Sequence, residues 1–366
     1  MLRARFAQHL PAGLKSYLRR LHKLARLIVL LTSRVMDLGL VFLFSPFWIG
    51  KFLRSWRGTA ILVYGNSDRR KNDNDSVEAN TLFQSIANSK FANAVFIFRH
   101  NKCHFPTLEF LWNVSKIQPK VAIFSSYNSR SHKQPAFLVV RLLKFKGCRV
   151  VSLWWDTCSQ HFSKKYGAEL RAFDLNVILD NPEKKFFEEI EQTLKGQFLF
   201  THPPVWFETE CTDIIQRKTD FFFCGSMSSY RGHRKNLFEV FRRQTFKQEI
   251  FATGETNLFY ADYVNKLRSA KIGLSLPESV DCDQLKARVF EVALSGALLV
   301  DRKNSQTDYF FEDGSEYLSF TDAQELHDLI EKILTNPSQY SHVAKNGYRR
   351  AKDLCNPDTF WEKILL

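Results

Sequence analysis

Short apolar runs alternate with helical stretches through the first half of the chain. Five runs of about strand length follow one another, at 61–65, 95–98, 121–126, 149–156 and 175–180. Apolar residues at helical spacing, at 77–88 and 137–146, separate several of these runs. Near-continuous apolar strands joined by helices are typical of a parallel sheet covered on both faces. The pattern therefore predicts an α/β domain, to which we assign residues 58–200.

A second alternating series begins at Phe221, after a segment that carries Pro203 and Pro204. Two prolines favour an extended connection, so residues 201–220 are interpreted as a linker. The second series predicts another α/β domain at 221–354, and a last helix is expected at 355–366. The chain has 366 residues, more than one ordinary core needs, and its 34 Phe residues supply ample apolar surface for two domains.

The most informative run is DQLKARVFEVALSGALLVD, at 283–301. Its apolar residues recur as on one helix face, a Ser-Gly pair ends the helix, and a buried strand follows. Lys286 and Arg288 lie in the first turns after Asp283, where the helix dipole and free N–H groups favour anions. Glu291, one turn further, can accept hydrogen bonds from ribose hydroxyls. The run predicts a nucleotide phosphate site; the alternative is a helix whose charges are solvated on its outer face.

A basic loop follows the apolar strand that begins at Phe221. Gly225 at the end of this strand allows a phosphate to approach the backbone closely. Arg231, Arg234 and Lys235 can converge on such a phosphate. The alternative is an ordinary strand-to-helix loop with solvated arginines.

Three runs carry a resemblance to a known family: ADYVNKLRSAKIGLSLP, KARVFEVALSGALLVDR and the segment that begins YFFEDGSEYLSF. Together they resemble the donor-binding half of the two-domain glycosyltransferases called GT-B, of the group 1 type and its spore-coat-maturation-like relatives. The resemblance implies two Rossmann-like α/β domains that face each other across a cleft. It also implies a hexosyltransferase-like reaction in which a nucleoside-diphosphate sugar is the donor.

The resemblance implies roles for individual residues. In retaining members the donor signature is a carboxylate residue followed, after seven intervening residues, by a glutamate. Asp283 and Glu291 have this spacing. It implies that Glu291 binds the donor ribose and that Asp283 lies near the transferred sugar. Lys286 and Arg288, with the basic loop at 225–234, would hold the diphosphate and stabilise its charge as the sugar leaves, so that no metal and no cofactor is needed.

Ligands of open α/β sheets meet the loops at the carboxyl ends of the strands, so these loops of the first domain should bind the acceptor. The candidate acceptor-binding residues in these loops are Asn66, Asp68, His100 and Trp155. Asp156 can act as a catalytic base, with His161 five residues further, or the neighbouring tryptophans can stack on a sugar. An inverting enzyme needs such a base, whereas in a retaining one the leaving diphosphate can assist. The Asp283 and Glu291 spacing favours retention.

The basic character of the chain is concentrated at its start. The net charge is +14, and residues 1–57 hold 11 Lys and Arg against one acid, Asp37. A leucine stripe surrounded by cations, followed by a strongly apolar run, predicts a helical segment that lies on an anionic membrane surface. A membrane span at 27–49 is disfavoured because it would bury Arg34 and Asp37. A helical hairpin that packs on the protein itself is a further alternative.

The seven cysteines are scattered and never paired as C-x-x-C, which indicates neither a disulfide framework nor a zinc site and fits a reducing environment. We therefore expect a cytoplasmic, peripherally membrane-associated glycosyltransferase that acts on a surface-glycan or lipid-linked acceptor. A catalytically inactive sugar-nucleotide-binding scaffold of the same fold stays an alternative. A nucleic-acid binder is a further one, but the chain lacks a recognised module, so no nucleic-acid partner is expected.

Overall fold

The computed structural model describes residues 32, 35–43, 56, 58–65, 77–99, 106–125, 127, 135–155, 162–180, 198–226, 234, 237–238, 246–253, 258–276 and 283–366. The chain forms two compact units. The first unit contains residues 1–59, 102–120 and 128–148, and the second contains residues 60–101, 121–127 and 149–366. Most of the predicted membrane-binding segment lies outside the described residues.

The described secondary structure of the first unit consists mainly of helices. It contains a helix at 35–43, called the docked helix below, together with α5 (Pro106–Ile117) and α6 (Leu138–Phe145). The Asp37 carboxylate accepts hydrogen bonds from the backbone N–H groups of Thr107 at 3.1 Å and Leu108 at 3.3 Å. The first N–H groups of a helix have no partner within the helix, so Asp37 caps α5. The docked helix therefore lies against the start of α5. The alternative of a helical hairpin that packs on the protein itself stays a prediction, because most of the segment lies outside the described residues.

The second unit contains two sheets, and all strand pairs in both are parallel. The first sheet has the order β2-β1-β3-β4-β5-β6. Its strands are β1 (Ile61–Gly65), β2 (Val95–Arg99), β3 (Val121–Ser125), β4 (Arg149–Trp154), β5 (Leu175–Ile178) and β6 (Phe198–Phe200). The helices of this unit around it are α4 (Val77–Ala87) and α7 (Phe162–Leu170), with a short 3-10 turn, η1 (Ala92–Ala94). β1 and β3 are buried along their whole length, which explains their unbroken apolar sequence.

The last helix of the chain packs into the core of this first sheet. It is α15 (Pro357–Leu365), and the Asn356 side chain caps it by accepting from the Thr359 N–H at 3.2 Å. Phe360, Trp361 and Ile364 are buried with residues of β1, β3, β4 and β5. The Trp361 Nε1 donates to the Ser85 hydroxyl of α4 at 3.0 Å. The end of the chain thus completes a core that its first strands begin.

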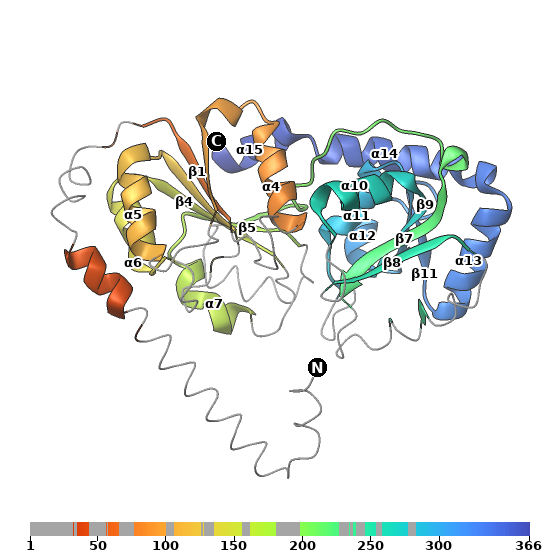
Figure 1. Ribbon diagram of the computed structural model, residues 1–366, viewed down its shortest axis with the longest axis horizontal. Helices are drawn as coiled ribbons and strands as arrows, with labels where there is room; N and C mark the ends of the chain where they lie inside the picture. Colours follow the sequence, from red (N-terminus) through yellow and green to blue (C-terminus); the bar gives the residue numbers. More distant parts are fainter. Residues whose placement is uncertain are drawn as a thin grey trace, which may run out of the picture. The chain divides into compact units, whose positions relative to one another are not determined.

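The second sheet has the order β11-β10-β9-β7-β8. Its strands are β7 (Thr219–Ser226), β8 (Gln248–Thr253), β9 (Ala270–Ser275), β10 (Leu298–Arg302) and β11 (Leu318–Phe320). The helices around it are α10 (Tyr260–Ser269), α11 (Ala287–Leu294), α12 (Ser305–Phe310), α13 (Ala323–Thr335) and α14 (Ser341–Leu354), with η2 (Ile214–Gln216) and η4 (Pro337–Tyr340). One apolar cluster joins α10, α11, α12 and α14 to the sheet, and another joins α13 and the start of α14 to it. Figure 1 shows these helices beside the strands of the second sheet.

The two predicted α/β domains with parallel sheets are confirmed. The predicted boundaries, 58–200 and 221–354 with a linker at 201–220, stay predictions. Within the described part of the chain, no helix is both long and apolar enough to cross a bilayer.

Candidate functional site

The second sheet brings the predicted phosphate-binding residues to one edge. Because its strands are parallel, the end of β7 and the start of α11, which follows β9, meet at the carboxyl edge of the sheet. α11 begins at Ala287, with Lys286 as its N-cap residue in an extended conformation. The helix therefore begins later than the sequence predicted, since Asp283 belongs to the loop before it. Lys286 and Arg288 still lie at the positive end of the helix dipole.

Two guanidinium groups lie over the ring of Phe223, near the end of β7. The guanidinium carbon of Arg288 is 5.4 Å from the ring centroid, and that of Arg234 is 5.8 Å from it. These cation–π contacts hold both cations at the strand end. Arg234 is 1% exposed and also donates to the Leu276 carbonyl, so the alternative of a solvated arginine is wrong at this position.

Gly225 leaves room for this arrangement. A Cβ at this position would lie 2.7 Å from the Phe223 Cζ and 3.1 Å from the Arg288 Nη1. Any larger residue would therefore displace the ring or the guanidinium that rests on it. The sequence prediction gave Gly225 a role in letting the backbone approach a phosphate; the structure adds a steric reason for glycine.

Glu291 is buried on α11, with 4% of its surface exposed. Its Oε2 accepts from the Tyr263 hydroxyl at 2.5 Å, and its Oε1 accepts from the Thr81 Oγ1 of α4 at 3.4 Å. Burial raises the pKa of the Glu291 carboxyl, while the Tyr263 hydroxyl and the Arg288 guanidinium oppose this rise. The alternative of a solvated outer-face charge is wrong for Glu291. Its predicted contact with a donor ribose stays a prediction.

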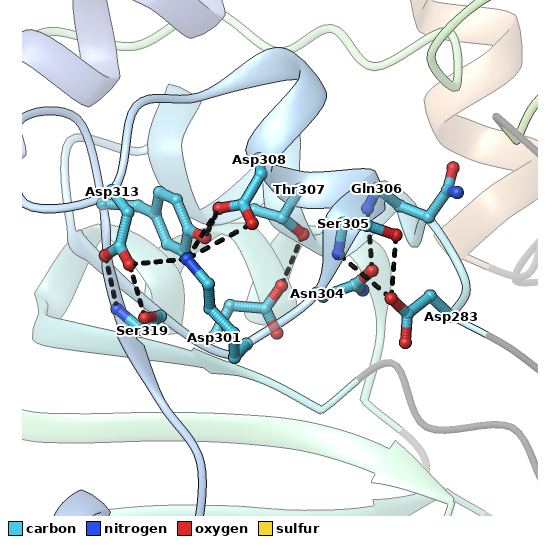
Figure 2. Close-up of polar contacts among 11 residues, drawn as sticks. Asp283, Asp301, Asn304, Ser305, Gln306, Thr307, Asp308, Asp313 and Ser319 are labelled. Atoms are coloured by element: carbon cyan, nitrogen blue, oxygen red, sulfur yellow. Dashed lines mark hydrogen bonds and ion pairs between the residues drawn. The ribbon is translucent and has the colours of Figure 1, made fainter. Parts of the chain in front are cut away.

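The Asp283 carboxylate forms hydrogen bonds with the first residue of α12. Its Oδ2 accepts hydrogen bonds from the Ser305 N–H at 3.0 Å and the Ser305 Oγ at 2.8 Å (Figure 2). A carboxylate is favourable beside a helix start because the first N–H groups have no partner within the helix. The carboxylate thus ties the loop before α11 to α12, and its predicted place near the sugar stays a prediction.

Two further hydrogen bonds fix the same loop. The Asn304 side chain, which also caps α12, donates from Nδ2 to the Gln284 carbonyl at 2.9 Å. The Leu285 N–H donates to the Asp180 carboxylate, just after β5, at 2.8 Å. Residues 283, 284 and 285 are therefore each anchored, and Lys286 follows them at a defined position. Such preorganisation reduces the entropy lost when a ligand binds.

The buried Asp301 carboxyl, at the end of β10, should make the free energy of unfolding depend on pH. The side chain is fully buried, and its Oδ2 accepts from the Thr307 Oγ1 at 2.6 Å (Figure 2). Burial raises the pKa of Asp301 to about 7, and the hydrogen bond from Thr307 opposes this rise only in part. Between pH about 4 and about 7 the unfolded carboxyl ionises while the folded one keeps its proton. We expect this group to lower the free energy of unfolding as the pH rises through that window, by at most about 1.4 kcal/mol per pH unit.

Urea unfolding of the wild type and of Asp301→Asn between pH 4 and 8 measures this effect. The amide is neutral at every pH and can still accept from Thr307, so the variant should lack this part of the slope and gain relative stability above pH 7. Asp353→Asn, at an exposed carboxyl of α14, is the matched control and should follow the wild type. Equal slopes for the wild type and Asp301→Asn would show that Asp301 does not hold a proton in the fold.

Several predicted residues lie outside the described part of the chain: Asp156, His161, Arg231, Asn66, Asp68 and His100. Their predicted roles as base, donor ligand and acceptor ligands stay predictions. Trp155 is described, and its Nε1 donates to the Ser125 Oγ of β3 at 3.0 Å. This places Trp155 at the carboxyl edge of the first sheet, where the acceptor site was predicted.

Four residues of the site were not singled out from the sequence: Thr81, Asp180, Tyr263 and Phe223. Asp180 ends the apolar run at 175–180, and a carboxylate at the end of a parallel strand is a signal that could have identified it. Tyr263 lies on a helix face with apolar neighbours, and its pattern does not distinguish it from core. Thr81 has no sequence signal at all.

Residues 234–365 match the family model described as glycosyl transferase-like. This match covers α11, the donor-type run at 283–301 and the rest of the second sheet after β7. None of the curated proteins matches the sequence.

Solved structures share the fold over most of the chain. HepE from Anabaena aligns with a TM-score of 0.57 at 12% identity, covering 84% of this chain and 98% of HepE. Sucrose-phosphate synthase from Thermosynechococcus elongatus aligns with a TM-score of 0.55 at 10% identity, covering 84% and 96% of the two chains. An α-glucosyltransferase aligns with a TM-score of 0.56 at 10% identity, covering 84% and 98%.

At such identities the structures show the fold alone, and the family match covers residues 234–365. Both agree with the resemblance drawn from the runs at 260–361. The chain has the fold of these solved structures, and its residues 234–365 are similar to the glycosyl transferase-like family.

Proposed function

We propose that the chain transfers a sugar from a nucleoside-diphosphate sugar, and that the donor diphosphate binds at the start of α11. The observation that carries this proposal is the pair of cations at one strand edge: Lys286 at the N-cap and Arg288 held over Phe223 beside Gly225. A helix start with cations beside a glycine-containing strand end suits phosphate groups. HepE and the α-glucosyltransferase were both solved with UDP-glucose, which supports a nucleotide sugar as the donor class.

The proposed reaction needs no metal. Lys286 and Arg288 neutralise the diphosphate charge that grows as the sugar leaves, which is the electrostatic task that a cation would otherwise perform. The preorganised loop at 283–285 keeps both cations in place before the donor arrives. A test is sugar release or transfer in the presence of EDTA, which should proceed at the rate seen with added Mg²⁺.

We propose retention of the anomeric configuration, supported by the spacing of Asp283 and Glu291. The Ser305 contacts of Asp283 suit a role in holding the loop, so the leaving diphosphate is the group that assists the acceptor hydroxyl. An NMR spectrum of the product that shows inverted configuration would move the base role to Asp156 or His161.

The proposed acceptor is a surface glycan or a lipid-linked glycan at the cytoplasmic face of a membrane. The support is the segment 1–57, whose 11 Lys and Arg against one acid suit an anionic lipid surface. An enzyme held at such a surface meets lipid-borne acceptors in two dimensions. No nucleic acid is proposed as a partner.

A thermal-shift screen over nucleotide sugars tests the donor proposal. A nucleotide sugar that binds the folded state raises Tm by mass action, and at 100 times its Kd it stabilises by about 2.7 kcal/mol. We expect one base to stand out, together with its free nucleoside diphosphate. A flat response to UDP, GDP and ADP sugars at millimolar concentration would contradict the proposed donor class.

A further inference from the structure

Large apolar side chains are exposed mainly in the first unit. Among the described residues, thirteen large apolar side chains are exposed, and seven of them lie in this unit. Four of the seven belong to the docked helix, where exposure is 68% for Val35, 59% for Met36, 73% for Phe42 and 68% for Leu43. With Gly39 between them, these positions share one helix face. The exposed face of the docked helix is therefore entirely apolar.

The opposite face carries the polar contact. Asp37 is 1% exposed and caps α5, and Val41 is 4% exposed. A surface helix of a soluble protein normally turns a polar face outward, whereas this helix is apolar on its exposed face as well as at the buried Val41. Asp37 is also the one acidic residue among residues 1–57. Its carboxylate caps α5, and the remaining charged side chains of this segment are all cationic.

We propose that the exposed face of the docked helix is a bilayer-contact surface, with Val35, Met36, Phe42 and Leu43 inserted among the acyl chains of an anionic membrane. This inference rests on the proposed function, which attaches the chain to a membrane through residues 1–57. Charge complementarity selects this occupant: Arg34 precedes the helix in sequence, and Lys51, Arg54 and Arg57 follow it. An apolar helix face with flanking cations is the pattern of a helix that lies in the plane of an anionic interface.

The hydrogen bonds of Asp37 also favour a helix that lies along the membrane surface over one that spans the membrane. A spanning helix would move this carboxylate from its two N–H partners into hydrocarbon, which costs several kcal/mol on insertion scales. Held on α5, the helix lies at the surface and buries one face only. The first unit offers a second contact of the same chemistry on α5, where the Lys116 Nζ lies 4.6 Å over the ring of Trp112, which is 41% exposed. Aromatic and cationic side chains of this kind gather at membrane interfaces.

Vesicle co-sedimentation of the full chain tests the surface. We expect the wild type to bind vesicles of equal phosphatidylglycerol and phosphatidylcholine, and to bind pure phosphatidylcholine weakly. Phe42→Ser, Leu43→Ser and the double variant remove apolar side chains that are mostly exposed, and the double variant should bind roughly tenfold or more weakly. Ile215→Ser is the matched control, since it removes an apolar side chain that is 52% exposed in the second unit. It should bind as the wild type does.

Two outcomes would overturn the inference. Vesicle binding of the double variant equal to that of the wild type would leave the charges of residues 1–57 as the sole attachment, and the proposed membrane association would survive. A wild-type dimer in light scattering that the double variant breaks, without vesicle binding by either, would make a second copy the occupant. Donor binding in the thermal-shift screen is independent of both outcomes, so it separates failure here from failure of the proposed donor.

Discussion

Replacing Arg288 by alanine is expected to weaken the binding of the nucleoside diphosphate found by thermal shift by about 10- to 150-fold. A charge-assisted hydrogen bond contributes about 1.5–3 kcal/mol, and about 1.4 kcal/mol corresponds to a tenfold change in Kd. Alanine also leaves the face of Phe223 without the guanidinium that lies 5.4 Å from its centroid. The buried Glu291 carboxyl loses its neighbouring cation, so we expect a lower Tm as well. Calorimetry below the melting range of both proteins measures the affinity.

Two variants make this result specific. Arg288→Lys keeps the charge but loses the planar fork, so its affinity should lie between those of the wild type and Arg288→Ala. Arg349→Ala removes an exposed cation of α14 in the same domain and should leave the affinity unchanged. Lys286→Ala should weaken binding in the same direction. Unchanged affinity in Arg288→Ala would remove α11 from the donor site.

Replacing Trp361 by alanine is expected to lower the free energy of unfolding by about 3–5 kcal/mol, the usual cost of deleting a large buried aromatic side chain. Trp361 is fully buried in the core of the first sheet, and its Nε1 donates to Ser85 at 3.0 Å. The variant leaves both a cavity and a buried hydroxyl that has lost this donor. Chemical unfolding followed by circular dichroism measures the loss.

Leu366 supplies the control from the end of the same chain. It directly follows α15 and is 82% exposed, so Leu366→Ala should change stability by less than about 0.5 kcal/mol. The large difference between the two variants is the signature of a last helix that belongs to the first sheet. If both cost the same small amount, α15 is not part of that core.

Most strands of the first sheet were predictable because each is an unbroken apolar run, whereas β8, with the sequence QEIFAT, carries no such run. The runs at 61–65 and 121–126 appear as β1 and β3, both fully buried. The place of α15 was not predictable from its own residues. Phe360, Trp361 and Ile364 show that the helix has a buried face, but the first sheet that receives this face lies far earlier in the sequence. A helix pattern identifies a buried side and does not identify its partner.

The candidate site also contains some residues that the sequence could assign and some that it could not. Gly225, Lys286 and Arg288 could be assigned to one region because turn chemistry and helix starts carry local signals. The contact of Thr81 with Glu291 joins positions 210 residues apart, and that of Asp180 with the Leu285 N–H joins positions 105 apart. Such contacts depend on how the chain folds back on itself. The role of Asp283 was predicted from its spacing, whereas its hydrogen bonds to Ser305 depend on where α12 begins.

Hydrogen exchange with and without the nucleotide sugar selected by thermal shift tests the central claim most directly. The claim is that the donor binds at the end of β7 and the start of α11. Binding there should slow exchange in peptides that cover residues 223–226 and 285–291, and α13 should exchange as before. Protection confined to other parts of the chain, or a bound donor that leaves both peptides unchanged, would contradict the account.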